Sequence, residues 1–327
     1  MSITANSNAT PLPQGASSWV DPATLMRIKN LQLRAKRVVD GFHNGLHRSP
    51  LHGFSVEFSE YRRYSEGDDP KGIDWKLFAR SDRFYIKKFE DETNRRCLLV
   101  VDQSKSMTYG SPSSKIEYTK MDYARTLAAT FAYYLTLQRD AVGMMTFEAD
   151  VKEMVPARFR TGQLKRMLGL LEKPSEGNAT DLVRPLSQLA ELAKQRSLVI
   201  VISDFLVPWQ PLQVPLAFLR ARHHEVMLLR VLDPSEIELD LKQPTMLRDL
   251  ESGKEIYIDP MSAKQRYRER FDAHAAGLAK LAGQLGISLT SMTTESPLEL
   301  ALFDLLSRQS QGKRSLRSYG MQRGGGA

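Results

Sequence analysis

The sequence predicts an α/β fold with a doubly wound, mostly parallel sheet that carries helices on both faces. Two apolar runs are the first observation, because residues 98–101 and 198–202 contain only Leu, Val and Ile. Such runs are typical of strands that are buried on both faces. The second observation is that these runs alternate with segments of helical periodicity, which indicates strand–helix–strand units and a parallel sheet.

The expected elements follow one another from residue 21. A helix begins at Pro22, because Asp21 is a good N-cap and Pro is favoured at the first helical position, and it extends to about Val39, before Gly41 and Gly45. Two half-buried strands are predicted at 54–58 and 83–89. The remaining predictions are, in order, strand 98–101, helix 120–138, a hairpin of 141–147 with 151–155, helices 162–171 and 182–194, strand 197–203, helix 212–221, strand 225–232, a hairpin of 246–250 with 256–258, a helix over about 267–285 and strand 287–290.

Composition divides the chain into four parts. Residues 1–20 are rich in Ser, Asn, Pro and Ala and are predicted to be disordered. Residues 21–95 form an N-terminal helix and a β-rich module, and residues 57–96 contain ten acidic and ten basic residues. Residues 96–310 form the main α/β domain, with 233–259 as a hairpin insertion. Residues 311–327 are a basic tail that is also predicted to be disordered.

Composition and charge also indicate which compartment and which kinds of partner to expect. No apolar run approaches the roughly 18 residues that span a bilayer, and Met1–Ser18 lacks the pattern of a signal peptide. A single cysteine, Cys97, fits a reducing compartment, so we expect a cytoplasmic protein without a membrane partner. Of the net charge of +8, five charges lie in 308–327. The body is therefore nearly neutral and nucleic acid is not the expected partner, although the tail alone would allow a salt-sensitive contact.

Oxygen-bearing side chains follow two of the predicted buried strands. Asp102 and Asp204 each come after an apolar run, and ligands of open α/β sheets bind beyond the carboxyl ends of the strands. Ser104 and Ser106 follow Asp102 at every second residue, so the three side chains can point to one side. A hard cation such as Mg²⁺ takes about six oxygens, some of them from water. The loop 177–182 lies between the two strands and offers Thr180, or alternatively Asp181, as a further oxygen donor.

Together these residues resemble the metal-ion-dependent adhesion site of von Willebrand A domains. The resemblance rests on Asp-x-Ser-x-Ser at 102–106, on a Thr before Asp-Leu at 180–182, and on a strand that ends in Ser-Asp at 203–204. It implies a Rossmann-like von Willebrand A-type domain that binds Mg²⁺, or another divalent cation such as Mn²⁺ or Ca²⁺. The implied ligands are Asp102, Ser104, Ser106, Thr180 and Asp204.

A second resemblance concerns the segment before the domain. Residues 61–70, 73–75 and 79–80 are similar to the signature of the bacterial family known as domain of unknown function 58. The family often appears beside MoxR-type AAA+ ATPases, so the resemblance implies such a partner, which would supply an acidic residue to the metal. Arg62, Asp68, Asp74, Trp75 and Arg80 are assigned interaction or scaffold roles, and the Trp75 ring is expected to pack in the core.

These observations predict a non-enzymatic, divalent-metal-dependent protein-binding module. It would act as an adaptor or co-chaperone of the ATPase in protein remodelling or cofactor insertion. Hydroxyl ligands are neutral, so a bound cation would keep positive charge and accept a carboxylate from another chain. The alternative is a metal-dependent phosphoester hydrolase that uses the cation as a Lewis acid. A P-loop ATPase is excluded, because the sequence contains no Gly-x₄-Gly-Lys-Ser/Thr motif.

Overall fold

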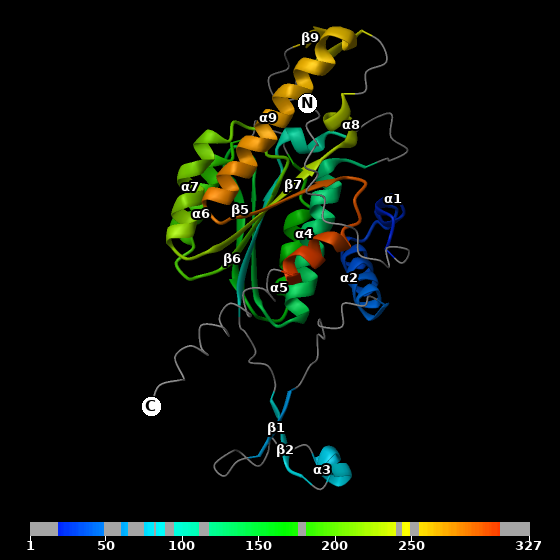
Figure 1. Cartoon of the computed structure of the whole chain (residues 1–327), viewed down its shortest axis with the longest axis vertical. Helices are drawn as coiled ribbons and strands as arrows, with labels where there is room; N and C mark the ends of the chain where they lie inside the picture. Colours follow the sequence, from blue (N-terminus) through cyan, green and yellow to red (C-terminus); the bar gives the residue numbers. More distant parts are fainter. Residues whose placement is uncertain are drawn as a thin grey trace, which may run out of the picture.

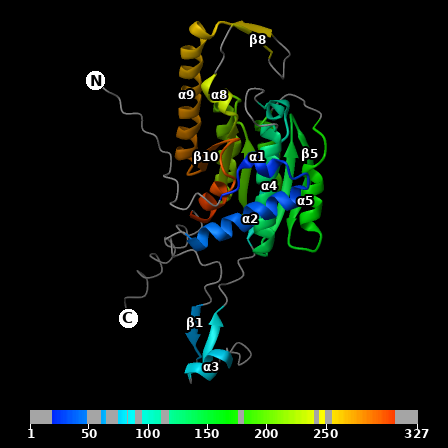
Figure 2. The same ribbon diagram turned by 90° about the vertical axis from the view of Figure 1, so that its right-hand side faces the viewer.

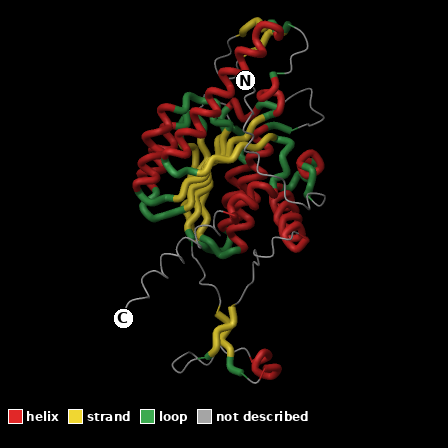
Figure 3. The backbone as a smooth tube through the Cα atoms, in the orientation of Figure 1, coloured by secondary structure: helices red, strands yellow, loops and turns green. Residues whose placement is uncertain are grey.

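A six-stranded sheet forms the centre of the molecule (Figure 3). The structure is a computed structural model that describes residues 19–48, 60–64, 75–81, 83–88, 95–110, 118–175, 181–239, 244–248 and 255–307. The two terminal segments predicted to be disordered thus lie outside the described residues, except for Trp19 and Val20. No helix of the described part combines the length and the hydropathy that a membrane span requires.

The strand order is β10-β7-β6-β3-β4-β5, and only β5 runs antiparallel to its neighbour. This arrangement confirms the predicted mostly parallel α/β sheet, and β4 and β5 form the predicted hairpin. The strands are β3 (Arg96–Asp102), β4 (Ala141–Phe147), β5 (Val151–Arg158), β6 (Leu198–Ser203), β7 (Glu225–Leu232) and β10 (Ser288–Thr293).

Helices cover both faces of the sheet, as Figure 1 shows. Alternate residues of one strand point to opposite faces. Accordingly, Leu99 and Val101 of β3 belong to one hydrophobic cluster, and Leu98 and Val100 belong to the other. The first cluster lies against α4 (Lys120–Leu137) and α5 (Gln163–Leu171). The second lies against α6 (Val183–Leu192), α7 (Gln213–Ala221) and α9 (Pro260–Gln284), so the apolar runs are explained by burial on both sides.

The predicted N-terminal helix is wrong in its boundaries. The chain forms α1 (Pro22–Met26) and α2 (Leu31–Arg48), and α2 packs across α4 (Figure 2). The break occurs because the Asn30 side chain accepts a hydrogen bond from the backbone of Leu33 (2.9 Å), while Arg34 donates to the Met26 carbonyl (2.9 Å). Gly41 does not end the helix. A Cβ there would lie only 3.1 Å from the Glu299 carboxylate, so glycine permits a close approach.

The described part of the N-terminal module contains one antiparallel pair of strands and a short helix. Strand β1 (Glu60–Arg63) pairs antiparallel with β2 (Tyr85–Lys88), which lies within the predicted strand 83–89, and α3 (Trp75–Ser81) lies between them in the chain. The predicted strand 54–58 lies outside the described residues. The expected burial of Trp75 is wrong, since its side chain is 61% exposed and meets the rings of Phe78 and Phe84 edge-on at the module surface.

The segment predicted as an insertion contains a short helix and the expected hairpin. Helix α8 (Pro234–Glu238) follows β7 directly, and β8 (Thr245–Arg248) pairs antiparallel with β9 (Glu255–Ile258). The long helix α9 begins at Pro260, seven residues before the expected start, and returns the chain to β10. A final helical segment over 299–307 closes the described chain.

Candidate metal centre at the carboxyl end of the sheet

Asp102 is the last residue of β3 and is completely buried. Its strand lies between β4 and β6, so the carboxylate emerges at the centre of the sheet edge. One carboxylate oxygen accepts the backbone N–H of Ser104 (2.9 Å), and the other accepts the Ser203 hydroxyl (2.6 Å). Each oxygen accepts a hydrogen bond and still has a lone pair for a further partner.

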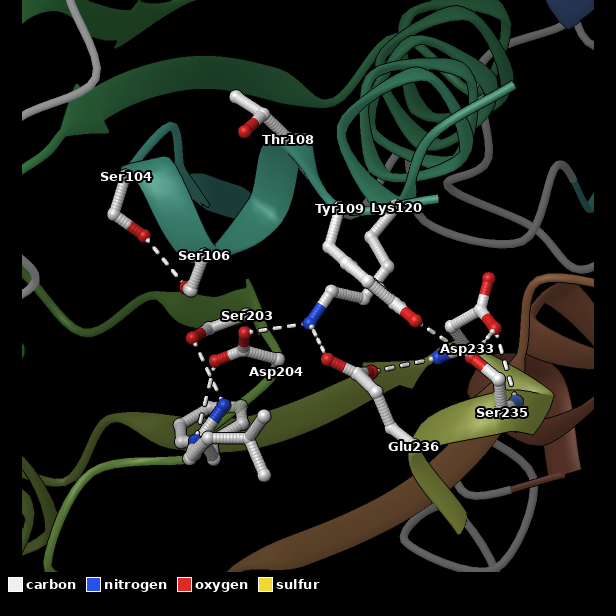
Figure 4. A network of polar contacts seen from close by, with 12 residues as sticks. Ser104, Ser106, Thr108, Tyr109, Lys120, Ser203, Asp204, Asp233, Ser235 and Glu236 are labelled. Carbon is white, nitrogen blue, oxygen red and sulfur yellow. Dashed lines mark hydrogen bonds and ion pairs between the residues drawn. The ribbon is translucent and has the colours of Figure 1, made fainter. Parts of the chain in front are cut away.

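The two serines follow Asp102 on a tight turn. The turn is a short 3₁₀ segment, η3 (Lys105–Thr108), and its Met107 is fully buried and anchors it to the core. The hydroxyls of Ser104 and Ser106 lie 3.1 Å apart. Figure 4 shows that they point toward one another. The spacing in the sequence therefore brings both oxygens to one side, as predicted.

Asp204 reaches the same edge from the neighbouring strand. It follows β6, which pairs in parallel with β3, and it is 1% exposed. The backbone N–H of Leu206 donates to one of its oxygens (3.2 Å). Between them Phe205 adopts a positive φ of 50° with its ring in the core, so the chain turns sharply after the carboxylate. Parallel pairing thus places the two predicted acids side by side.

The proximity of these carboxylates is electrostatically costly. Burial raises the pKa of Asp102 to about 7, and the neighbouring Asp204 raises it as well. Hydrogen bonds from Ser203 and Ser104 act in the opposite direction but do not outweigh burial. A cation between two such groups would favour the charged form of both.

Lys120 provides a cation that the sequence analysis missed. It is the first residue of α4, its side chain is fully buried, and its ammonium lies between two carboxylates (Figure 4). The Nζ atom donates to Asp204 at 2.9 Å and to Glu236 at 2.5 Å. Burial disfavours the charge, but the two carboxylates outweigh it and hold the pKa of Lys120 above its usual value. The sequence gives only a weak indication of this role. A lysine in the first turn of a helix is unfavourable next to the positive end of the helix dipole, so its presence there suggests an acidic partner.

Glu236 reaches the site from α8, within the segment predicted as an insertion. Its second oxygen accepts the backbone N–H of Asp233 (2.9 Å), and Asp233 in turn caps the helix through Ser235 (2.9 Å). The Tyr109 hydroxyl, from the loop after η3, lies 3.0 Å from the Ser235 hydroxyl. The start of the insertion is therefore attached to the metal-site loop.

Arg230 supports the other side of Asp204. Its Nε donates to the backbone carbonyl of Asp204 (3.1 Å), and its guanidinium lies 5.0 Å above the ring of Phe271 in α9. The residue is 2% exposed. Because Arg230 belongs to β7, the next strand in the sheet, this contact fixes the turn that follows β6.

Three further predicted residues, Thr180, Asp68 and Asp74, lie outside the described residues. Asp181, the alternative to Thr180, caps α6 by accepting from the backbone N–H of Val183 (2.8 Å). In the module, Arg62 is opposite Ile86 in the β1–β2 pair, while Trp75 and Arg80 are exposed on α3.

The oxygen set is suited to a hard cation. The described chain contains no group of three or more His, Cys, Asp or Glu side chains in metal-binding arrangement. The site instead combines two carboxylates with hydroxyls, a donor set typical of Mg²⁺ with bound water rather than of zinc. Asp102, Ser104, Ser106 and Asp204 would hold the ion.

Comparison with known proteins identifies relatives without assigned functions. Residues 60–279 match the family described as protein of unknown function DUF58. An uncharacterized protein of Mycobacterium tuberculosis, Rv1480, is 29% identical over 282 residues, which cover 84% of this chain and 86% of the relative.

Two solved structures are similar at low identity. One is an aerotolerance-related membrane protein of Bacteroides fragilis, with 14% identity and a TM-score of 0.45 over 65% of this chain and 99% of the other. The second is BatB of Bacteroides thetaiotaomicron, with 16% identity and a TM-score of 0.44 over 66% and 99%. Scores of this size support no transfer of function.

Proposed function

This chain belongs to the DUF58 family, and we propose that it is a non-enzymatic protein-binding module that depends on a divalent cation. Mg²⁺ is the proposed ion, and Asp102, Ser104, Ser106 and Asp204 are its proposed ligands. Thr180, from the loop before α6, would complete the protein part of the shell, as the resemblance to the adhesion-site motif implies.

One observation carries the proposal: four oxygen-bearing side chains from two separate loops meet at one sheet edge. Asp102 accepts from Ser203 at 2.6 Å, which joins the ends of β3 and β6, and the serine hydroxyls lie 3.1 Å apart beside them. The two carboxylates balance the charge of the ion, but the four side chains fill fewer than the roughly six oxygen positions that Mg²⁺ takes. An acidic side chain from another protein can fill a remaining position as the last ligand.

The proposed partner is a MoxR-type AAA+ ATPase that presents an Asp or Glu. This part of the proposal rests on the family resemblance, in which such ATPases often accompany the chain. The complex would then serve protein remodelling or cofactor insertion.

The metal site is tested by Asp102→Asn in titration calorimetry with MgCl₂. Asparagine keeps the shape of the side chain but removes the charge that an ion requires, so we expect at least about a 100-fold loss of Mg²⁺ affinity. Asp150→Asn is the matched control, because Asp150 is an exposed acid paired with Arg184, and it should leave the affinity unchanged. Equal Mg²⁺ affinities of wild type and Asp102→Asn would contradict the proposed metal site.

The partner is tested by capture of the purified ATPase on immobilised wild-type protein. We expect binding in MgCl₂ and its loss in EDTA or in Asp102→Asn. If neither EDTA nor Asp102→Asn changes the binding, the metal has only a structural role. The absence of binding under every condition would contradict the ATPase partner. Turnover of a generic phosphoester by the Mg²⁺-loaded protein, lost in Asp204→Asn, would instead favour the hydrolase.

A further inference from the structure

We propose that Lys120 is an internal cation that competes with the divalent ion for Asp204, and that Glu236 retains the ammonium when the ion binds. This inference rests on the proposed metal site. It adds a regulation of that site that the ligand motif does not contain.

The position of the ammonium is defined by two short contacts. Lys120 Nζ lies 2.9 Å from an Asp204 oxygen and 2.5 Å from a Glu236 oxygen, and neither Lys120 nor Asp204 is open to solvent. The other Asp204 oxygen already accepts from Leu206. Both oxygens of this carboxylate therefore accept a hydrogen bond from the protein itself.

A divalent ion on Asp204 would meet the ammonium as a neighbouring like charge. Their repulsion is strong because the site is buried and solvent screening is weak. The ion must either displace the ammonium from Asp204 or bind with reduced affinity. In both cases the wild-type lysine lowers the affinity for the metal.

Glu236 is suited to keep the displaced ammonium. It already holds the shorter of the two contacts, and its carboxylate is fixed by the Asp233 N–H (2.9 Å). Its backbone carbonyl accepts the Tyr267 hydroxyl of α9, which fixes α8 from the other side. Lys120 can therefore lose Asp204 without becoming an unpaired buried charge.

The hydrogen bonds around Lys120 also connect the metal site to α8. The backbone of Lys120 donates to the carbonyl of Tyr109 (2.9 Å), and the Tyr109 hydroxyl contacts Ser235 of α8 (3.0 Å). Occupation of Asp204 would thus alter the bonding of α8, the segment that leads into the β8–β9 hairpin.

The experiment is calorimetric titration of MgCl₂ into wild type, Lys120→Met and Lys105→Met. Lys120→Met removes the competing charge, so we expect Mg²⁺ affinity to rise at least about tenfold. Lys105 lies between Ser104 and Ser106 but is exposed, so Lys105→Met is the matched control and should change the affinity less than about twofold. Glu236→Gln should weaken Mg²⁺ binding, because Lys120 then has Asp204 as its remaining carboxylate partner.

The outcomes separate this inference from the metal site itself. Wild-type binding with no gain in Lys120→Met overturns the competition and leaves the metal site standing. Binding by Lys120→Met alone supports the competition, whereas no binding by either protein overturns both proposals. If circular dichroism shows that Lys120→Met does not fold, Lys120→Met/Glu236→Gln removes one charge of each sign and is compared with Glu236→Gln. The double variant should bind Mg²⁺ more tightly, and equal affinities would overturn the inference.

Discussion

Asp140 lies directly before β4, at the end of the sheet opposite Asp102, and is 6% exposed. Burial raises its pKa from 3.8 to about 6, although the backbone N–H of Arg95 donates to the carboxylate (3.2 Å) and acts in the opposite direction. The native state therefore holds this proton more tightly than the unfolded chain does. Above pH 6 the carboxylate is charged in both states, and its burial costs stability.

Asp140→Asn should raise the free energy of unfolding at pH 7 by about 1–3 kcal/mol, because asparagine can accept the same hydrogen bond without a charge. Between about pH 6 and 3.8, the Asp140 carboxyl of the wild type takes up a proton when the chain folds. The free energy of unfolding of the wild type therefore rises relative to that of Asp140→Asn as the pH falls. The difference should therefore shrink toward pH 4. Urea unfolding of both proteins between pH 4 and 8 measures it.

Asp150→Asn removes an acid of the same type from an exposed position and serves as the control. It should change the unfolding free energy by less than about 1 kcal/mol, with little dependence on pH. A pH-independent difference between wild type and Asp140→Asn would contradict the assignment of the raised pKa.

At the scale of single elements, the β4–β5 hairpin depends on a glycine. The pairing register shifts between Val142 and Met144, and Gly143 lies at this shift. A Cβ on Gly143 would lie 2.5 Å from the nitrogen of Ala157 and 2.7 Å from the carbonyl oxygen of Val155. Both are backbone atoms of β5, which a change of side-chain rotamer cannot move.

Gly143→Ala should therefore lower the free energy of unfolding by at least about 1–3 kcal/mol through overpacking. Gly169→Ala, in α5, is the matched control, because a Cβ added at Gly169 would meet no atom within 4 Å. Alanine is the better helix former, so this variant should gain about 0.5–1 kcal/mol. The midpoint of thermal unfolding should fall in Gly143→Ala and rise in Gly169→Ala, relative to wild type. Equal shifts of the two midpoints would contradict the steric explanation.

At the scale of the whole molecule, the folded core extends beyond the family match. Residues 60–279 exclude α1, α2, β10 and the helical segment 299–307. Yet Val38 and Phe42 of α2 belong to the same hydrophobic cluster as β3 and α4. The Phe42 ring packs edge-on against Phe303, with ring centres 4.7 Å apart. The two ends of the described chain thus complete one core.

Phe42→Ala should lower the free energy of unfolding by about 3–5 kcal/mol, because it leaves a cavity between α2, α4 and the last helical segment. Leu33 is 53% exposed on the same helix, so Leu33→Ala should stay within about 0.5 kcal/mol of wild type. Urea denaturation measures both. A small effect of Phe42→Ala would mean that the N-terminal helices are not part of the cooperative core.

Much of the fold was predictable from short stretches of sequence. Continuous apolar runs mark strands buried on both faces, and their alternation with helical periodicity indicates a parallel sheet. Parallel strands end at a common edge, so Asp102 and Asp204 were expected to meet there, and the structure places them together. Helix boundaries were less predictable: α2 continues through Gly41, where the glycine permits a close approach to the distant Glu299 carboxylate and does not end the helix.

The sequence by itself determined the acids, the serines and the sheet edge where they gather, since these depend on local spacing and strand direction. Only the tertiary structure decided which charges lie against them. Lys120 and Glu236 are 116 residues apart in the sequence, and the folded chain brings them into contact. No local pattern encodes such a contact, because a buried ion pair depends on which surfaces exclude water.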